Sequence, residues 1–310
     1  MESLVLRFTD FWGGFDDESN FIKGFFENEL GIRVRIANPK ENADIEFVST
    51  FHYSSKILQL FDAVSSEFSQ EKSFYYASGT KHGIFIPRGS KRAKLRIWFS
   101  GENFRYTPDT ADGYICFDES DDSENVLYFP YWMYRLDWGF GTSEYLEQVD
   151  ARILHRSRAR EERSRNVCMF SNTREPGKMK ILKAVNREIT VEKFGSAFGN
   201  PVVNKYEISR TFGLQICPEN SIYPGYVTEK LIEAWSCGNV PIWQGLDSHH
   251  DFNPEAIVDV TNLKLDEISE LISSISDEQL VHMRSLNILR NPATLLPFKN
   301  FIIKLMKAGL

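Results

Sequence analysis

Strand and helix alternate most clearly in residues 206–245, which read YEISRTFGLQICPENSIYPGYVTEKLIEAWSCGNVPIWQG. This stretch predicts a buried strand at 212–217, a loop with two prolines and a glycine, a helix at 227–238 and a second buried strand at 240–243. A strand that is followed by a helix and another buried strand is typical of a βαβ unit in a parallel sheet. We therefore expect this part of the chain to have an α/β fold.

The same alternation continues on both sides of this stretch. In the C-terminal half it predicts strands at 166–171, 189–195 and 256–260 and helices at 175–188 and 265–275. In the N-terminal half it predicts strands at 4–12, 32–37, 43–49, 72–78, 94–100 and 114–117 and helices at 18–31 and 55–68. Two Rossmann-like domains with a binding cleft between them fit this pattern better than one very large sheet. We expect an N-terminal domain at 1–160, a C-terminal domain at 161–285 and a helical segment at 286–310.

Composition narrows the class of protein. The 310 residues carry 36 Lys and Arg against 43 Asp and Glu, a net charge of -7, and 42% of them are hydrophobic. Such a chain is typical of a globular protein, and its acidic balance disfavours nucleic acid as the main partner. No run of residues has the length and apolar character of a transmembrane helix, and the start MESLVLRFTDFWGG lacks the regions of a signal peptide. A cytoplasmic location and four buried free cysteines are therefore expected.

Arginines concentrate positive charge between the two predicted domains. They are Arg152, Arg156, Arg158, Arg160, Arg163 and Arg165. A solvated helix or linker is one interpretation, since Glu161 and Glu162 offer partners. The alternative is peripheral contact of the 152–165 segment with anionic lipid headgroups, which would place the protein at the inner face of the membrane.

The loop at 218–230 carries the chemistry. In a parallel sheet this loop lies at the carboxyl edge of its strand, where helix starts bind anions such as phosphate. Thr228 is expected to cap the following helix, and Lys230 brings a positive charge to a helix start, a placement that a bound pyrophosphate would explain. Glu229 can accept hydrogen bonds from a sugar hydroxyl, and Asn220 and Tyr226 add polar contacts. Neither G-x-G-x-x-G nor G-x-x-x-x-G-K-[ST] is present, so the pattern favours a nucleotide-sugar site.

The run PENSIYPGYVTEKLIEAWSCGNVPIWQG closely resembles the signature of the α-1,3-fucosyltransferase family, in which an E-N pair precedes Y-V-T-E-K and a V-P strand follows the helix. Other family-like stretches occur in the same order along the chain: FWGG at 11–14, WFSGEN at 98–103, YICFD at 114–118 and FSN at 170–172. The resemblance implies the GT-B fold, an α/β architecture of two Rossmann-like domains that face each other across a cleft. It also implies inverting transfer from GDP-fucose with no cofactor or required metal.

The resemblance assigns roles to individual residues of this chain. It implies two catalytic carboxylates, Glu102 and Glu229, of which Glu102 is the candidate general base. The implied donor-binding residues are Ser171, Asn172, Lys178, Asn220, Tyr226, Glu229 and Lys230. Lys178 stands where the family usually has an arginine, which keeps the charge but loses the bidentate fork, and Arg174 is an alternative cation for that role.

The N-terminal half, which the resemblance implies binds the acceptor, is rich in aromatic residues. Apolar sugar faces stack on aromatic rings, so Trp12, Gly13, Tyr131 and Trp132 are candidate acceptor contacts, although most aromatics of an α/β domain belong to its core. The expected acceptor is a glycan such as an N-acetyllactosamine or a lipopolysaccharide O-antigen chain, modified at O3 of GlcNAc or Glc. The region at about 65–94 is longer than in compact bacterial relatives, so the acceptor side is expected to be remodelled. Two alternatives stay open: transfer from another GDP-6-deoxyhexose, and a non-catalytic nucleotide-sugar-binding protein.

Overall fold

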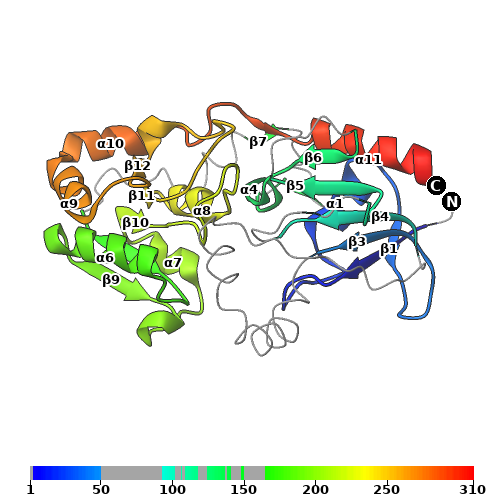
Figure 1. Ribbon diagram of the computed structural model, residues 1–310, viewed down its shortest axis with the longest axis horizontal. Coiled ribbons are helices and arrows are strands. Elements are labelled where there is room, and N and C mark those ends of the chain that lie inside the picture. Colours follow the sequence, from blue (N-terminus) through cyan, green and yellow to red (C-terminus); the bar gives the residue numbers. More distant parts are fainter. Residues whose placement is uncertain are drawn as a thin grey trace, which may run out of the picture. The chain divides into compact units, whose positions relative to one another are not determined.

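The computed structural model describes residues 3–49, 93–101, 106, 109–117, 124–136, 138–140, 148–149 and 165–310. The chain divides into two compact units (Figure 1). Unit 1 comprises residues 1–148 together with 294–310, and unit 2 comprises residues 149–293. The first boundary therefore falls earlier than the expected position at 160. Residues 294–310, expected to be part of a separate helical segment, belong to unit 1.

Unit 1 is built on a six-stranded sheet in the order β2-β1-β3-β4-β5-β6, in which every pairing is parallel. Its strands are β1 (Leu4–Thr9), β2 (Val34–Ile36), β3 (Ala43–Val48), β4 (Ala93–Phe99), β5 (Gly113–Cys116) and β6 (Val126–Tyr128). Its described helices are α1 (Phe21–Asn28), α4 (Tyr131–Tyr134) and α11 (Leu296–Gly309). A separate two-stranded sheet pairs β7 (Gln148–Val149) with β13 (Ala293–Thr294).

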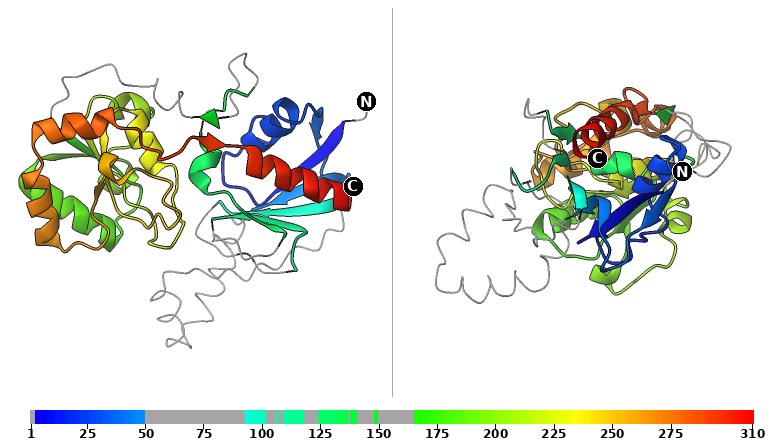
Figure 2. Two further views of the ribbon diagram at one scale, coloured as in Figure 1. Left: turned by 90° about the horizontal axis from the view of Figure 1, so that it is seen from above. Right: turned by 90° about the vertical axis from the view of Figure 1, so that its right-hand side faces the viewer.

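Helix α11 joins unit 1 because one of its faces is apolar. Phe298, Phe301, Ile302 and Leu305 are buried on that face. The Phe298 ring packs 4.7 Å from the ring of Phe25 in α1, measured between centroids. Figure 2 shows α11 lying along the strands of unit 1. The C-terminal helix is therefore one wall of the first core.

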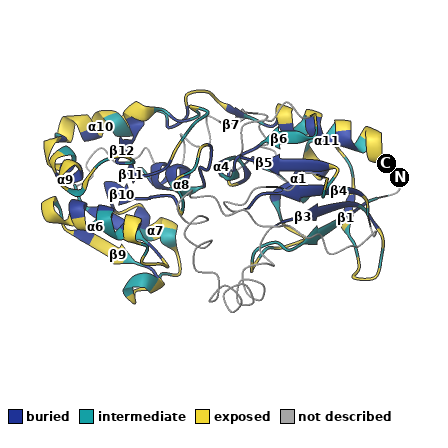
Figure 3. Ribbon diagram, in the orientation of Figure 1, coloured by how far each residue is buried: buried dark blue, intermediate teal, exposed yellow. Residues whose placement is uncertain are grey.

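Unit 2 is built on a five-stranded parallel sheet in the order β12-β11-β10-β8-β9. Its strands are β8 (Val167–Phe170), β9 (Val191–Phe194), β10 (Leu214–Ile216), β11 (Val240–Trp243) and β12 (Val258–Asp259). Its helices are α6 (Pro176–Glu188), α7 (Lys205–Ser209), α8 (Lys230–Ser236), α9 (Leu265–Ser274) and α10 (Asp277–Ser285), with short 3₁₀ turns at Ser196–Phe198 and Pro254–Ala256. The strands and the inner helix faces are buried, and exposed residues lie on the outer faces of α6, α9 and α10 (Figure 3).

The strand order creates a crevice in unit 2. After β8 the chain first adds β9 on one side and then crosses to add β10 on the other. The connections from β8 and β10 therefore leave in opposite directions, and they open a crevice at the carboxyl ends of these strands. Unit 1 repeats the same order around β1. The predicted α/β class with parallel sheets is confirmed in both units.

Two further expectations concern the whole chain. The cysteines Cys116, Cys168, Cys217 and Cys237 are all buried and free, as predicted. Burial raises the pKa of the Cys168 and Cys217 thiols, which makes them poor nucleophiles. Among the helices that the structure describes, none is long and apolar enough to cross a bilayer.

Candidate functional site

A cavity of about 430 Å³ occupies the crevice of unit 2. Its walls come from the segments that follow β8, β9 and β10 and from the first turns of α6 and α8. The predicted donor-site residues on its lining are Ser171, Asn172, Lys178, Asn220, Glu229 and Lys230. One predicted donor residue, Tyr226, is 2% exposed and does not line the cavity. Residues far apart in sequence thus meet where the fold places ligands in parallel sheets.

The turn after β8 forms one rim of the cavity. The Ser171 hydroxyl donates to the carbonyl oxygen of Thr173 at 2.7 Å. The Asn172 side chain accepts hydrogen bonds from the amide of Ser196 at 3.2 Å and from its hydroxyl at 3.1 Å. These contacts tie the segment after β8 to the segment after β9, so the rim is held by hydrogen bonds within the protein.

Lys178 lies in the first turn of α6 and is 8% exposed. Its ammonium group donates to the Thr173 hydroxyl at 3.0 Å and to Asn220 Oδ1 at 2.9 Å, and it lies 3.2 Å from a carboxylate oxygen of Glu175. A buried ammonium group needs such partners because desolvation is costly. Asn220, predicted as a donor contact, therefore holds Lys178 on the cavity wall.

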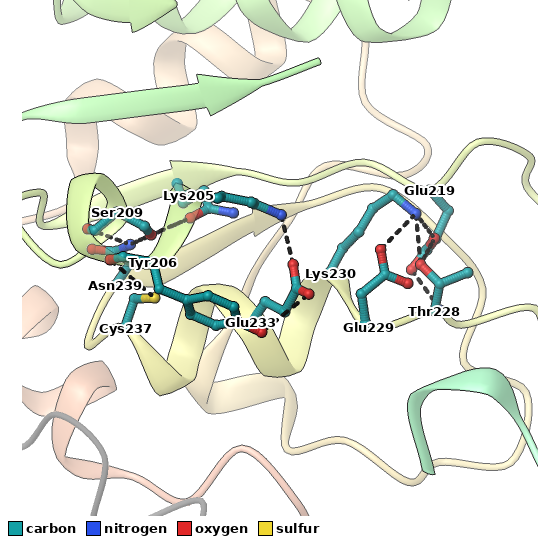
Figure 4. A network of polar contacts seen from close by, with 11 residues as sticks. Lys205, Tyr206, Ser209, Glu219, Thr228, Glu229, Lys230, Glu233, Cys237 and Asn239 are labelled. Atoms are coloured by element: carbon teal, nitrogen blue, oxygen red, sulfur yellow. Dashed lines mark hydrogen bonds and ion pairs between the residues drawn. The ribbon is translucent and has the colours of Figure 1, made fainter. Parts of the chain in front are cut away.

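Lys230 is the first residue of α8, and residues that precede the helix hold its ammonium group (Figure 4). Its ammonium group donates to Glu219 Oε2 at 3.0 Å and to the Thr228 hydroxyl at 2.6 Å. The Thr228 amide and hydroxyl in turn donate to Glu219 at 2.9 and 2.7 Å. The carboxylate of Glu229 lies farther from Lys230, at 3.9 Å, and lines the cavity.

Helix α8 starts three residues later than the expected position, 227. Helix α8 begins at Lys230, and its N-cap position is occupied by Glu229, which makes no side-chain cap hydrogen bond. Thr228 does not cap the helix, because its amide and hydroxyl are both engaged by the Glu219 carboxylate. The cation is therefore placed by a carboxylate from the end of β10 and not by a helix cap.

Two residues of the site are missed by sequence reasoning. Glu219 is the first residue of the E-N pair, but only Asn220 has a role in the sequence-based prediction. Lys205 lines the cavity from α7, pairs with Glu233 of α8 at 2.6 Å and lies 5.6 Å from the centre of the Phe170 ring. The signal for Glu219 was its position between a buried strand and the asparagine. Lys205 has no local signal, since its partner lies 28 residues away in sequence.

Arg174, the alternative cation, does not line this cavity. Its Nε donates to the carbonyl oxygen of Ala197 at 2.6 Å, and its guanidinium lies 5.9 Å from the centre of the Phe198 ring. It lines a different cavity, with Lys193 and Asn200. Of these two candidates, Lys178 is the cation on the wall of the 430 Å³ cavity.

The predicted acceptor residues lie in unit 1 and only partly come together. Trp12 lines a cavity of about 420 Å³ with Phe15, Tyr134 and Trp138. Gly13, Tyr131 and Trp132 do not line it, although the Tyr131 ring packs edge-on against Trp12 at 6.0 Å between centroids. Trp132 is 3% exposed and belongs to the core.

Several predicted features fall outside the described residues. Glu102, the candidate general base, is one of them, although β4 ends three residues before it at Phe99. The region 65–92 and the arginines of 152–164 are also outside. Of the basic segment, Arg165 is described. Its guanidinium donates to the carbonyl oxygens of Ile275 and Ile272 at 2.5 and 3.0 Å, so it is used within unit 2.

The arrangement in unit 2 suits an anionic ligand. Two ammonium groups, Lys178 and Lys230, reach the wall of one cavity from different helices, and a third, Lys205, joins them. Charge-assisted hydrogen bonds from such groups to phosphate oxygens are among the stronger polar contacts in proteins. In the described parts of the chain, no group of three or more His, Cys, Asp or Glu side chains is placed to hold a metal ion.

Comparison with known proteins points to one family. Residues 160–286 match the C-terminal region of glycosyltransferase family 10 (fucosyltransferase). An alpha-(1,3)-fucosyltransferase from Helicobacter pylori is 29% identical over 212 residues, which are 57% of this chain and 44% of that protein. A 4-galactosyl-N-acetylglucosaminide 3-alpha-L-fucosyltransferase from Bos taurus is 34% identical over 73 residues, 23% of this chain and 20% of that protein. The chain thus spans less than half the length of these curated relatives.

Solved structures extend the likeness to both units. A crystal structure of an alpha1,3-fucosyltransferase with GDP-fucose matches 98% of this chain and 90% of that chain, with a TM-score of 0.66 at 19% identity. The structure of an alpha1,3-fucosyltransferase with GDP covers the same shares, with a TM-score of 0.64 at 20% identity. At this identity the match establishes the fold.

Two parallel sheets of this strand order, together with these matches, assign the chain to the GT-B class of glycosyltransferase folds. The Y-V-T-E-K signature and the cavity beside it lie inside the segment that matches the family. Residues 160–286 thus match the fucosyltransferases of glycosyltransferase family 10, and the resemblance in the motifs is confirmed.

Proposed function

We propose that this protein is an α-1,3-fucosyltransferase that moves L-fucose from GDP-fucose to a hydroxyl group of a glycan. The observation that carries the proposal is the convergence of Lys178 and Lys230 on one cavity at the crevice of unit 2. Both residues lie in the segment that matches the family, and relatives of this fold were crystallised with GDP-fucose and with GDP. The cavity is the proposed site of the GDP moiety.

The proposed chemistry is an inverting displacement. A general base, for which Glu102 is the candidate, would remove the proton of the acceptor hydroxyl as its oxygen attacks the anomeric carbon. Negative charge develops on the departing diphosphate, where the ammonium groups of Lys178 and Lys230 would stabilise it. Glu229, on the cavity lining, is the candidate for contact with a sugar hydroxyl. Because lysines would neutralise the leaving group, we expect transfer to continue in the presence of EDTA.

The acceptor is proposed to be a glycan that offers O3 of GlcNAc or Glc, such as an N-acetyllactosamine or a lipopolysaccharide O-antigen chain. Two observations support this acceptor class. The relatives are an alpha-(1,3)-fucosyltransferase and a 4-galactosyl-N-acetylglucosaminide 3-alpha-L-fucosyltransferase, and unit 1 has an aromatic cavity beside Trp12. Contact of the 152–165 segment with a membrane surface remains a separate proposal. A screen of glycan acceptors with GDP-fucose, read by mass spectrometry, tests the acceptor class.

Lys178→Met tests the donor site directly. We expect the Kd for GDP to rise about 10- to 100-fold, because a hydrogen bond to a charged group contributes about 1.5–3 kcal/mol. Calorimetric titration with GDP measures this change. The partner Glu175 is 43% exposed, so the substitution leaves no buried lone charge. The matched control is Lys183→Met, an exposed lysine of the same helix, for which we expect no change.

Glu102→Ala separates catalysis from donor binding. We expect GDP to bind as in the wild type while transfer to the acceptor falls by at least about 10²-fold, the usual contribution of a general base. Near-wild-type turnover would contradict the base assignment. A wild-type protein that binds GDP-fucose but transfers to no acceptor would favour the non-catalytic alternative, and faster turnover with another GDP-6-deoxyhexose would change the donor.

A further inference from the structure

The carboxylate of Glu219 has unusual surroundings for a site that binds anions. Its side chain is 0% exposed. It accepts hydrogen bonds from the amide of Thr228 at 2.9 Å, from the hydroxyl of Thr228 at 2.7 Å and from the ammonium of Lys230 at 3.0 Å. Its own amide donates to the carbonyl oxygen of Gln244 at 2.8 Å, which fixes the backbone beneath it. Three donors thus converge on one buried carboxylate.

On electrostatic grounds alone, a carboxylate is unfavourable beside a site that binds phosphate. A buried negative charge beside a phosphate site repels the ligand and offsets part of the charge of Lys230. Burying the carboxylate also has a desolvation cost, which is repaid only when donors satisfy its oxygens. The contacts show what the carboxylate does instead, because its side-chain partners are two residues at the start of α8, Thr228 just before the helix and Lys230 at its first position.

We propose that Glu219 is a positioning residue that presents the Lys230 ammonium to the diphosphate of the donor. Glu219 does not touch the nucleotide and acts through Lys230. The inference rests on the proposed function, since it requires a nucleoside diphosphate in the cavity. It adds a residue to the donor site and assigns it a role that differs from those of the lysines.

The hydrogen-bond directions explain why a carboxylate is required. The Thr228 hydroxyl donates to Glu219 Oε2 and accepts from Lys230, which also donates to Oε2. Both oxygens of residue 219 must therefore accept, since Oε1 receives the Thr228 amide. Glutamine offers one acceptor and one donor. In either orientation its NH₂ group faces a donor, so Gln at this position cannot accept all three hydrogen bonds.

The wall behind Glu219 limits its movement. A Cβ atom at Gly245 would lie 3.0 Å from Glu219 Cγ and 2.2 Å from the Trp243 ring. The Gly245 amide donates to the Thr261 hydroxyl at 3.1 Å, and that hydroxyl donates back to the Gly245 carbonyl at 2.9 Å. Because Gly245 has no side chain, there is room beside it for the side chain of Glu219. The hydrogen bonds between Gly245 and Thr261 fix the backbone there and so limit the movement of the carboxylate.

Two substitutions distinguish geometry from charge. Glu219→Gln removes the charge, and Glu219→Asp keeps the charge but shortens the side chain by one methylene. If the carboxylate positions Lys230, both variants raise the Kd for GDP by about tenfold or more, as loss of a charge-assisted contact does. If only the charge matters, Glu219→Asp keeps the wild-type Kd and Glu219→Gln binds GDP more tightly. Either of these last two results would overturn the positioning role.

Unit 1 offers a matched control. Glu46 is also a buried carboxylate, 3% exposed, that accepts a threonine hydroxyl, from Thr9 at 2.9 Å, and pairs with a cation, Arg96 at 2.9 Å. Glu46→Gln is expected to affect the free energy of unfolding of unit 1 and to leave the Kd for GDP unchanged. A loss of GDP affinity in this variant equal to that of Glu219→Gln would mean that any buried ion pair has the same effect and would contradict the proposal.

A double-mutant cycle with Lys230→Met provides the decisive readout. If Glu219 acts through Lys230, then Glu219→Gln causes no further loss of GDP affinity in the Lys230→Met background. The effects of the two substitutions on the melting temperature should partly cancel. Lys230→Met alone leaves Glu219 buried with one partner fewer and lowers the melting temperature, and adding Glu219→Gln restores part of it. Additive losses of GDP affinity would overturn the inference, whereas a wild-type protein that binds no GDP would overturn the proposed function itself.

Discussion

Gly195 is the residue at which backbone geometry most directly shapes the cavity. Its φ of +105° lies in a region that residues with a side chain rarely adopt, and a Cβ atom there would lie 2.2 Å from the carbonyl oxygen of Ser171. We expect Gly195→Ala to lower the free energy of unfolding by at least about 1–3 kcal/mol, the usual cost of such strain, and to weaken GDP binding because Ser171 and Asn172 must move. Denaturant unfolding and calorimetric titration measure the two effects.

Gly199 offers a control in the same loop. It also has a positive φ, +69°, but no atom lies within 4 Å of a Cβ built there. Gly199→Ala should therefore cost about 1–2 kcal/mol of backbone strain and leave GDP binding unchanged. Equal effects of the two substitutions on GDP affinity would show that the close approach to Ser171 is not what matters.

At the residue scale, sequence reasoning finds those residues of the cavity whose chemistry is unusual for their place. Lys230 is a cation in the first turn of a helix, which is unfavourable for the helix dipole and therefore points to a ligand, whereas Lys178 is found only through the family resemblance. Glu219 and Lys205 escape this reasoning because their meaning depends on partners from other elements, Thr228 and Glu233. Tyr226, predicted as a donor contact, is buried and does not line the cavity, and burial of a loop residue against the core leaves no trace in its sequence.

At the element scale, hydrophobic runs predict the sheet of unit 2 well. Each of its five strands lies within a range expected from the sequence, and α6 and α9 agree within one residue at each end. Helices α7 and α10 are not predicted, and the start of α8 also differs from the expectation. A threonine before a helix is normally a cap, but here a carboxylate from β10 occupies both of its donors. Local capping rules fail where a distant side chain competes for the same groups.

The end of α9 depends on a residue that precedes the sheet. Arg165 donates to the carbonyl oxygens of Ile272 and Ile275, which are among those left without partners at a helix end. We expect Arg165→Ala to lower the free energy of unfolding of unit 2 by about 1–2 kcal/mol, since hydrogen bonds from a charged group are lost. Denaturant unfolding measures the change in the free energy of unfolding, and hydrogen exchange of the amides near the end of α9 shows where it arises.

Arg187 provides the comparison within unit 2. Its ion pair with Asp266 at 2.6 Å joins two exposed side chains, 44% and 84% exposed. Pairs of this kind contribute about 0–1 kcal/mol, so Arg187→Ala should change the stability little. A larger effect of Arg187→Ala than of Arg165→Ala would contradict the capping role of Arg165.

At the scale of the molecule, the two-unit architecture follows from the sequence, but the membership of the C-terminal helix does not. The pattern of α11 indicates an amphipathic helix, and nothing in its sequence indicates which core its apolar face joins. Its partners are Phe21, Phe25 and Phe129, whose rings lie within 5.4 Å of the Phe298 ring. Contacts between segments so far apart in sequence cannot be inferred from local periodicity.

Phe298→Ala tests this assignment. Phe298 is 0% exposed, and truncation of a buried phenylalanine to alanine costs about 3–5 kcal/mol. We expect the loss to appear in the unfolding of unit 1, measured by hydrogen exchange at β4 and α1, while protection in unit 2 stays unchanged. Leu296→Ala, on the same helix but 58% exposed, should have little effect. Loss of protection in unit 2 alone would place α11 in the other core.

The membership of residues 294–310 in unit 1 affects the order in which the two units are completed during synthesis. Unit 2 lies, in sequence, inside unit 1. A ribosome therefore completes every residue of unit 2 before it adds the helix that closes the first core. Because domains generally fold as units during synthesis, unit 2 can reach its native state while unit 1 still exposes the apolar surface that α11 will cover. In that case unit 2 completes its fold before unit 1, although the first strand of unit 1 is synthesised earlier.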